Sequence, residues 1–504
     1  MASVNTPNRI LEIIEHLPQS DDVISDLQQL KIAVSNTSNG CLKDIVNNTS
    51  LNSLYELLDS QNSEQVELCC QVLSHLMSSV DASVILVQYQ NVLSDGLNHN
   101  APSVRLLCIH QLQRVCDDAI QQISSYKDIL NKVINLLGDD VLLVAKEVNK
   151  LLKQWCGSRE TLDMLLSGPV FETMNSLMQK SDTIRYRVYE LIVDLANGSE
   201  SAMQQCQASG VLDLLINEIY KDDLLVQLNC LDQLTDIAMT EHGLQFLIKQ
   251  GIVLKLEQML EILETDPMVS FLLPGLIKFF GNMARLHPKE MFDQYDLFLK
   301  TVFSVLDSSD VSLSIVAIET VGFVGRTVEG KKALEDHGVN TSVAVRRLGA
   351  LMRNSPQEIR GRCITSIANL IHLEFEEQTP HLLSLTESWF NQIQKPMEFV
   401  VSMTTQPFED LRAPLLTLIR SLASLPWGQR RINEHPGFNE YLLNRSTEFD
   451  KRGKEMKYAI VRTLVDSPTA QEIFGNPFYL RLREYANEGA FYVRAETQVA
   501  LEST

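Results

Sequence analysis

Two stretches of the chain follow the same plan: Ile184-Arg-Tyr-Arg-Val-Tyr-Glu-Leu-Ile-Val-Asp-Leu-Ala196 and Val226-Gln-Leu-Asn-Cys-Leu-Asp-Gln-Leu-Thr-Asp-Ile-Ala238. Each is one helix long and ends in Asp, an apolar residue and Ala. The plan recurs at Leu272–Ala284, which ends in Asn-Met-Ala, at Leu313–Gly325 and at Leu411–Ala423. Self-similarity at a regular spacing identifies a repeat architecture, so we expect a chain built from stacked copies of one unit.

A small residue closes each copy and sets the period at about 40 residues. The small positions are Ala196, Ala238, Ala284, Gly325 and Ala423, and Ile371 fills the position in the one remaining copy. A second marker, a glycine followed by an apolar residue, keeps the same phase at Gly210, Gly251, Gly338 and Gly437, and Gly168 implies an earlier unit. The interval between Ile371 and Ala423 is longer than one period. We predict an insertion there, either a longer hairpin or an extra helix.

Within each copy the apolar residues occupy one face of a helix. Val188, Leu191, Ile192 and Leu195 lie at i, i+3, i+4 and i+7, and the same pattern in the third copy predicts that Phe280 is buried. Upstream of each copy are turn residues whose short polar side chains can accept hydrogen bonds from the first helical turn. These are Ser181-Asp182, Asp222-Asp223, Asp266-Pro267, Ser309-Asp310 and Ser355-Pro356. No long stretch alternates with period two, so we expect essentially no sheet.

Weaker copies extend the array in both directions. They begin near Asp21-Asp22-Val23, Asn62, Ala101-Pro102, Asp139-Asp140-Val141 and Met456. The total is about ten or eleven units, and units of this length with two or three helices are typical of armadillo and HEAT repeats. We therefore predict an all-α solenoid of the armadillo/HEAT type, curved, with a concave groove.

The composition fits a folded protein and excludes several function classes. Of the 504 residues, 45% are apolar, and the formal net charge is -21. A surface this acidic repels phosphate backbones and acidic lipid headgroups, so we expect no nucleic-acid partner and no membrane partner. The charge either keeps a long chain soluble or steers a basic partner, and the sequence favours neither explanation over the other.

The cysteines and the N-terminus bear on the cellular location. Nine scattered cysteines, an odd number with no Cys-x-x-Cys pair, are interpreted as small buried residues in a reducing compartment. Glu12 and Glu15 interrupt the only apolar stretch near the N-terminus, which does not resemble a secretory signal. No apolar run approaches the roughly 20 residues of a membrane span. We expect a cytoplasmic protein, with the nucleus as a second location.

In a solenoid each unit contacts only its neighbours, which leaves one long face open to a partner. In armadillo-type units the last helix lines this face, and the polar residue before the apolar-small pair points into it. The candidates at this position are Asp194, Asp236, Asn282, Asn369 and Ser421, and Arg187, Glu190 and Lys278 lie one or two turns earlier. The alternative interpretation is that these side chains are only solvated or cap the helix C-terminus.

No motif indicates catalysis, a cofactor or a metal site. The sequence has no phosphate-binding loop, no H-E-x-x-H and no G-x-S-x-G, and its ten histidines do not pair at metal-ligand spacing. Gly322, Gly325 and Gly330 do not fit a nucleotide-binding loop and are expected to permit tight packing instead. We expect a binding protein that is not an enzyme.

Four segments resemble one known family: Ser181–Ile192, Leu273–Asn282, Thr386–Phe390 and Glu472–Tyr485. They look like the corresponding segments of the 26S proteasome non-ATPase regulatory subunit 5 family, whose members are assembly chaperones of the proteasome regulatory particle. The similarity covers the chain from about residue 100 to about residue 494. On this basis the chain divides into weakly matching N-terminal repeats (1–100), central armadillo/HEAT-like repeats (101–380), C-terminal repeats with the insertion (381–494) and a flexible tail (495–504).

The resemblance implies a mechanism. The solenoid of this family binds the C-terminal domain of an ATPase subunit of the base ring, in an intermediate that also holds a second ATPase subunit and a large non-ATPase scaffold subunit. It blocks premature docking on the core particle and dissociates before the mature proteasome forms. The chain would then be a monomer when free, and the candidate groove residues would contact the partner.

Two other kinds of adaptor remain as alternatives. The first is a nuclear import receptor or a junctional armadillo protein. Import receptors hold basic peptides with a row of groove tryptophans paired with asparagines. Trp155, Trp389 and Trp427 are not at repeat spacing, which disfavours this reading. A phosphatase-type scaffold is the second alternative.

Overall fold

The computed structural model describes residues 6–115, 126–157, 159–262, 270–306, 308–404, 406 and 409–493. In these residues the regular secondary structure is helical throughout, without strands. The backbone divides into two compact units, Met1–Ile237 (unit 1) and Ala238–Thr504 (unit 2).

Unit 1 is a succession of short helices joined by tight turns. Its helices are α1 (Thr6–His16), η1 (Leu17–Gln19), α2 (Val23–Ser35), α3 (Asn39–Asn48), α4 (Asn52–Leu57), α5 (Ser63–Ser78), η2 (Ala82–Val84), α6 (Ile85–Gln88), α7 (Gln90–Leu97), α8 (Pro102–Leu112), α10 (Lys127–Asn135), η4 (Leu136–Gly138), α11 (Leu142–Trp155), α12 (Arg159–Leu165), α13 (Gly168–Met178), α14 (Asp182–Asn197), α15 (Glu200–Ala208), α16 (Val211–Glu218) and α17 (Leu224–Ile237).

Unit 2 continues in the same manner. Its helices are α18 (Glu241–Lys249), α19 (Ile252–Glu261), α21 (Leu273–Leu286), α22 (Pro288–Gln294), α23 (Asp296–Val305), α24 (Val311–Val324), α25 (Val328–Asp336), α26 (Val339–Asn354), α27 (Gln357–Ile371), η5 (Phe375–Glu377), α28 (Pro380–Asn391), α29 (Pro396–Thr404), α30 (Glu409–Ser424), α31 (Pro426–Glu434), α32 (Phe438–Leu443), η6 (Arg445–Thr447), α33 (Lys451–Asp466), α34 (Ala470–Phe474) and α35 (Asn476–Glu488).

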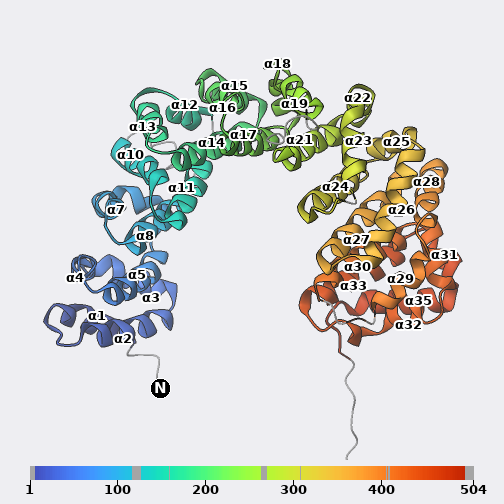
Figure 1. The fold of residues 1–504 in the computed structure, drawn as a ribbon. Helices are drawn as coiled ribbons and strands as arrows, with labels where there is room; N and C mark the ends of the chain where they lie inside the picture. The colour runs from blue at the N-terminus through green and yellow to red at the C-terminus, as the bar shows by residue number, and fades with distance from the viewer. Residues whose placement is uncertain are drawn as a thin grey trace, which may run out of the picture. The chain divides into compact units, whose positions relative to one another are not determined.

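One helix of each repeat stacks on its counterpart in the next repeat. We call these the third helices. In unit 1 they are α2, α5, α8, α11, α14 and α17, and in unit 2 they are α21, α24, α27, α30 and α33 (Figure 1). Within each unit every third helix contacts the next one along the chain. This arrangement confirms the predicted armadillo/HEAT-type solenoid and, with eleven third helices in the described residues, the predicted number of units.

The predicted helix starts follow from side-chain capping in three of the five turns. The side chain of Ser181 accepts from the backbone N–H of Ile184 at 3.3 Å. Asp223 and Asp310 cap α17 and α24 in the same way: their carboxylates accept from the backbone N–H groups of Leu225 and Ser312, each at 2.9 Å. These bonds satisfy backbone donors that have no partner within the helix.

The two remaining turns, Ser355-Pro356 and Asp266-Pro267, give no support to the prediction of side-chain capping. At Ser355-Pro356 the prediction of a side-chain cap is wrong, because Pro356 occupies the capping position and its ring has no acceptor. The turn at Asp266-Pro267 lies outside the described residues.

The glycines of the second marker have positive φ angles, as their role in the turn before each second helix requires. The values are 62° at Gly168, 80° at Gly210, 73° at Gly251, 45° at Gly338 and 82° at Gly437. An L-residue with a Cβ rarely adopts this region, so the repeat retains glycine where the chain must reverse.

The small residues that set the repeat phase lie in the core. Ala196, Ala238, Ala284 and Ala423 are fully buried. At Gly322 and Gly325 a Cβ atom would lie 2.6 Å from the Cα of Ser366 and 2.5 Å from the side chain of Leu370. Both glycines therefore allow α24 and α27 to approach closely, which confirms the packing role predicted for them.

The interval between Ile371 and Ala423 contains the short 3-10 helix η5 together with α28 and α29, among its described residues 372–404, 406 and 409–422. The interval between α24 and α27 contains only α25 and α26. The additional length lies in the connections, where the η5 turn precedes α28.

Most of the described cysteines and all three tryptophans are buried in the core. Of the described cysteines, which are unpaired, all but Cys41 are buried, and burial raises the pKa of the Cys230 thiol to about 12. Cys116 lies outside the described residues. Trp155, Trp389 and Trp427 are also buried, and the indole N–H of Trp427 donates to Thr386 Oγ1 at 3.2 Å. The tryptophans are therefore packing residues, and none lines an open face.

The first prediction concerns the stacked core. Phe280 is fully buried, with its ring centroid 5.4 Å from that of Phe279 and 5.8 Å from that of Phe298. Truncating a buried aromatic leaves a cavity, so Phe280→Ala should lower the free energy of unfolding by about 3–5 kcal/mol. Urea denaturation followed by circular dichroism measures this loss, and a variant with the wild-type midpoint would contradict the packing assignment.

The second prediction uses two helical glycines that differ in their surroundings. Gly322→Ala places a methyl group against the backbone of α27, so overpacking should destabilise the protein by about 1–3 kcal/mol. The matched variant is Gly361→Ala, whose methyl group would lie 3.4 Å from Leu411 in ordinary contact. It should be neutral or stabilising, because alanine favours a helix by about 0.5–1 kcal/mol over glycine. Equal melting temperatures for the two variants would count against close packing at Gly322.

Candidate functional site

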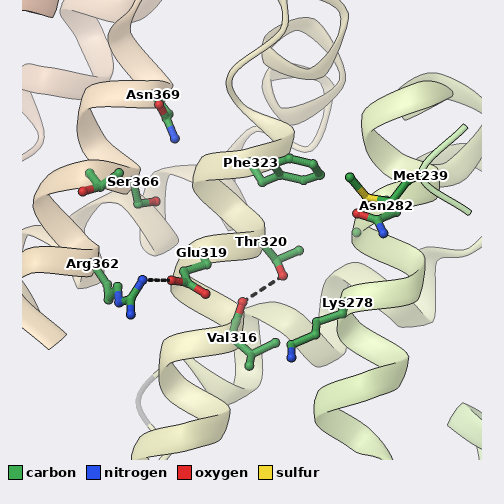
Figure 2. Close-up of a pocket in the computed structure, with 12 residues that line it drawn as sticks. Met239, Lys278, Asn282, Val316, Glu319, Thr320, Phe323, Arg362, Ser366 and Asn369 are labelled. Carbon is green, nitrogen blue, oxygen red and sulfur yellow. Dashed lines mark hydrogen bonds and ion pairs between the residues drawn. The ribbon is translucent and has the colours of Figure 1, made fainter. Parts of the chain in front are cut away.

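A pocket of about 430 Å³ opens on the third helices of unit 2 (Figure 2). We call it the α21–α24–α27 pocket. It is lined by Met239, which follows α17, and by residues of three successive third helices: Lys278, Gly281, Asn282, Val316, Glu319, Thr320, Phe323, Arg362, Thr365, Ser366 and Asn369. Each helix contributes residues spaced by three or four positions, so the pocket lies along one face of all three helices.

Polar side chains form the centre of this pocket. The guanidinium of Arg362 on α27 lies 2.6 Å from the carboxylate of Glu319 on α24, as Figure 2 shows. Lys278 extends from α21 toward α24 and is exposed, and within the described part of the chain no carboxylate lies at ion-pairing distance from it. The pocket therefore offers a free ammonium group beside a neutralised pair.

Ser366 is the most unusual member of the lining. Its side chain is only 2% exposed, and its Oγ has no hydrogen-bond partner among the described residues. Leaving a buried hydroxyl unpaired costs about 1–3 kcal/mol. Because it is buried, this hydroxyl offers little surface to a partner.

Cationic side chains from neighbouring repeats support the pocket edges. Arg285 donates to the backbone carbonyl of Met239 at 2.6 Å, and its guanidinium lies 5.5 Å from the ring centroid of Phe323. The ammonium of Lys331 donates to the carbonyls of Gly325 at 2.6 Å and Asn369 at 3.2 Å. Burial lowers the pKa of Lys331 to about 8, yet these carbonyls accept from the charged form. The ends of α24 and α27 are thereby tied together beside the pocket.

Three of the sequence-predicted candidates meet in this pocket. Lys278, Asn282 and Asn369 all line it. Asn282 is nearly buried and Asn369 is half-buried. Ser421 belongs to the same unit but is buried on α30, which packs between α27 and α33, so it offers little surface to a partner.

The other candidates lie in unit 1. Arg187 and Glu190 line a second recess between α11 and α14. Asp194 is exposed and forms an ion pair with Lys153 of α11 at 2.5 Å. Asp236 is also exposed, and its backbone carbonyl accepts from the side chain of Asn197 at 2.9 Å. The single row of groove residues expected from the sequence is thus distributed over two units, and each unit brings together only part of it.

Arg187 has a role that the sequence did not indicate. Its guanidinium donates to the backbone carbonyls of Leu137 at 3.0 Å and Asp139 at 2.8 Å. These carbonyls end the η4 turn of the preceding repeat, so Arg187 joins two repeats as well as lining the recess.

Sequence reasoning missed several pocket residues, and the repeat register could have found them. Phe323 stands two residues before Gly325, which is the position of Asn282 and Asn369 in their copies, but it was passed over because it is apolar. Arg362 and Ser366 lie seven and three positions before Asn369 on the same helix face. A search of every residue type at these register positions would have included all three.

The residues that line the pocket determine which groups it can bind. In the described residues no three His, Cys, Asp or Glu side chains are placed to hold a metal ion. The lining combines an ammonium, an ion pair, amides, hydroxyls and one aromatic ring, which suits polar and apolar side chains of another protein.

Among the described residues no single helix is long and apolar enough to cross a membrane. Ser63–Ser78 with Ala82–Gln88, and Val311–Val324 with Val328–Asp336, meet the length and composition criteria only as pairs bent by 111°.

The fold has a counterpart among solved structures. Yeast importin-beta (Kap95p) superposes with a TM-score of 0.56 at 12% sequence identity, covering 96% of this chain and 65% of importin-beta. At this identity the similarity concerns the fold alone, a HEAT-repeat solenoid.

Sequence comparisons identify the family. A model described as "Proteasome non-ATPase 26S subunit" matches residues 6–504. The chain is 35% identical over 456 residues to the human 26S proteasome non-ATPase regulatory subunit 5, covering 90% of both chains. It is 32% identical to the bovine protein of the same name, covering 98% of both. The chain therefore belongs to the family of proteasome non-ATPase 26S subunits, among the relatives of regulatory subunit 5.

Proposed function

We propose that this protein is a chaperone for assembly of the base of the 26S proteasome regulatory particle. It binds the C-terminal domain of an ATPase subunit of the ring and holds an intermediate that contains ATPase subunits and the large non-ATPase scaffold subunit. While bound, it blocks premature docking on the core particle. It dissociates before the mature proteasome forms. The free protein is a monomer, and it is located in the cytoplasm, with the nucleus as a second location.

The observation that carries this proposal is family membership over the full length of the chain. The human and bovine relatives are named as regulatory subunits of the proteasome, and the similarity covers 90% or more of each. Proteasome components are therefore the expected partners.

The exposed surface of the third helices supports a binding role for the chain. A specific interface between proteins buries roughly 1,200–2,000 Å² in total, which requires several adjacent repeats. The α21–α24–α27 pocket already draws on three adjacent third helices and presents Lys278, Asn282 and Asn369 together. These three residues, with Arg187, Glu190, Asp194 and Asp236, remain our candidates for partner contact, and Ser421 is the weakest of the set because it is buried.

An import-receptor function receives less support. The likeness to importin-beta extends only to the fold. The tryptophans that would hold a basic peptide in such a receptor are buried in the packing of this chain.

Copurification tests the proposed function directly. The tagged full-length chain should recover base ATPase subunits and the large scaffold subunit from cytosolic extract, without core-particle subunits. Mass spectrometry of the eluate identifies the partners. Recovery of complete proteasomes, of phosphatase subunits or of nuclear import cargo in place of base subunits would contradict the proposal.

The third prediction concerns the acidic candidates of unit 1. Asp194→Arg combined with Asp236→Arg reverses two exposed charges, and we expect recovery of the ATPase subunit to fall at least about tenfold, which corresponds to about 1.4 kcal/mol. The ion pair between Asp194 and Lys153 is exposed, so its loss should cost less than about 1 kcal/mol of stability. Helical circular dichroism and the melting temperature should therefore stay close to wild type.

A matched control separates position from net charge. Glu172 on α13 and Asp213 on α16 are exposed acidic residues of the same unit that lie outside the third helices. Glu172→Arg combined with Asp213→Arg makes the same charge change and should leave recovery of the ATPase subunit intact. If both double variants bind equally well, the partner does not use the acidic residues of α14 and α17.

The fourth prediction concerns the pocket of unit 2. Lys278→Glu should weaken ATPase recovery about tenfold, because it places a carboxylate beside Glu319 in the pocket that we assign to the partner. Lys332→Glu, on the exposed side of α25, is the control with the same charge change. Equal recovery by these two variants would remove the α21–α24–α27 pocket from the interface.

A further inference from the structure

A second recess, of about 420 Å³, lies between α11 and α14 in unit 1, and we call it the α11–α14 recess. Its lining residues are Leu142, Ala145, Lys146, Asn149, Lys150, Lys153, Arg187 and Glu190. Four of them are cationic and one is a carboxylate, in a chain whose formal net charge is -21. The recess is therefore basic on an acidic protein.

Two of these cations have no anionic partner. Within the described residues no carboxylate lies at ion-pairing distance from Lys146 or Arg187, and the bonds of Arg187 go to uncharged backbone carbonyls. Lys150 has a long contact of 3.8 Å to Glu147, and only Lys153 has a close partner, Asp194 at 2.5 Å. Positive charge thus remains available to an anionic ligand.

Asn149 provides an independent indication of a ligand. Its side chain is 8% exposed, it lines the recess, and its Oδ1 has no hydrogen-bond partner in the part of the chain that the structure describes. The orientation of an amide can be reversed, so the same group can donate an N–H or accept through its oxygen. A buried amide that lacks partners within the chain is suited to a ligand that supplies them.

The spacing of the lysines suits an extended peptide. Lys146, Lys150 and Lys153 lie at i, i+4 and i+7 on one helix face, a row about 10 Å long. Alternate side chains of an extended chain are about 7 Å apart and point to the same side. Two or three carboxylates therefore fit the row. Leu142, 53% exposed, adds an apolar surface at one end.

We propose that the α11–α14 recess binds an acidic, extended segment of a partner protein. Two or three Asp or Glu side chains within about five residues pair with Lys146, Lys150 and Arg187. The amide of Asn149 bonds to the peptide backbone or to one carboxylate, and an apolar side chain of the segment rests on Leu142.

A short peptide fits this recess better than a nucleic acid. Binding of nucleic acid draws on many phosphates along an extended basic surface. Here the basic groups are confined to one recess, and the net charge of -21 opposes approach of a long polyanion. A short acidic segment meets the local positive charge and avoids most of that repulsion.

The test uses the purified full-length chain and a labelled peptide. The probe is a fluorescein-labelled ten-residue peptide that carries four glutamates and a leucine, and the comparison peptide has glutamine in place of each glutamate. Fluorescence anisotropy should detect binding of the glutamate peptide and at least about tenfold weaker binding of the glutamine peptide. Binding should weaken as salt is raised. Equal affinity for both peptides would overturn the proposal, as would stronger binding of a single-stranded RNA of the same charge.

A matched pair of double variants locates the site. Lys146→Glu combined with Lys150→Glu should weaken binding of the glutamate peptide at least about tenfold. Lys127 and Lys180 are exposed lysines of the same unit outside the recess. Lys127→Glu combined with Lys180→Glu makes the same charge change and should alter the affinity by no more than about twofold. Equal losses in the two variants would mean that the overall charge, and not the recess, determines binding.

Asn149→Leu separates a binding role from a structural one. Replacing an unpaired buried amide with an apolar side chain should keep or raise the melting temperature. Affinity for the glutamate peptide should nevertheless fall. A variant that binds the peptide as tightly as wild type would remove Asn149 from the site. This assay contains no proteasome subunit, so a negative result contradicts the peptide-binding proposal and not the proposed function. A negative copurification result contradicts the proposed function and not the peptide-binding proposal.

Discussion

A single repeat of this protein cannot bury its apolar helix face by itself, and the rest of the structure depends on that constraint. Each third helix carries apolar residues that become buried against the neighbouring third helices and against the shorter helices beside them. The hydrophobic effect therefore acts mainly between neighbouring layers. Small residues such as Ala284 and Gly322 stand where the layers approach most closely, and a side chain of ordinary size there would force them apart.

Polar contacts between neighbouring repeats also join residues that are about one repeat length apart in the sequence. Lys153 pairs with Asp194, the ammonium of Lys331 bonds to the carbonyl of Asn369, and the side chain of Gln429 donates to Ser467. The members of each pair are separated by 41, 38 and 38 residues. These contacts satisfy helix ends and surface charges by drawing on the adjacent layer, which leaves the remaining polar side chains of the third helices available to a partner.

The two recesses differ in what they can offer, although both lie on third helices. The α21–α24–α27 pocket holds a neutralised pair, Arg362 with Glu319, together with an aromatic ring and an unpaired hydroxyl. The α11–α14 recess holds two cations, Lys146 and Arg187, that lack an anionic partner among the residues that the structure describes. The same backbone plan therefore presents two chemical environments, because the side chains that line the two recesses differ.

The fold was predictable from the sequence because its signals are local. The glycines at Gly210 and Gly437 and the caps at Ser181 and Asp310 act within one turn of the chain, and each was placed correctly. The site was only partly predictable. The direction of a side chain on a third helix depends on how its neighbours pack, which the register does not specify. Ser421 is thus buried, and Phe323, which was not among the polar candidates, lines the pocket.

The limited reach of the contacts between layers has a mechanical consequence. Within either unit, bending the array requires only a small rotation at each junction, because each third helix contacts the next one along the chain. The elastic cost of a change in curvature is thereby divided among many junctions in place of one hinge.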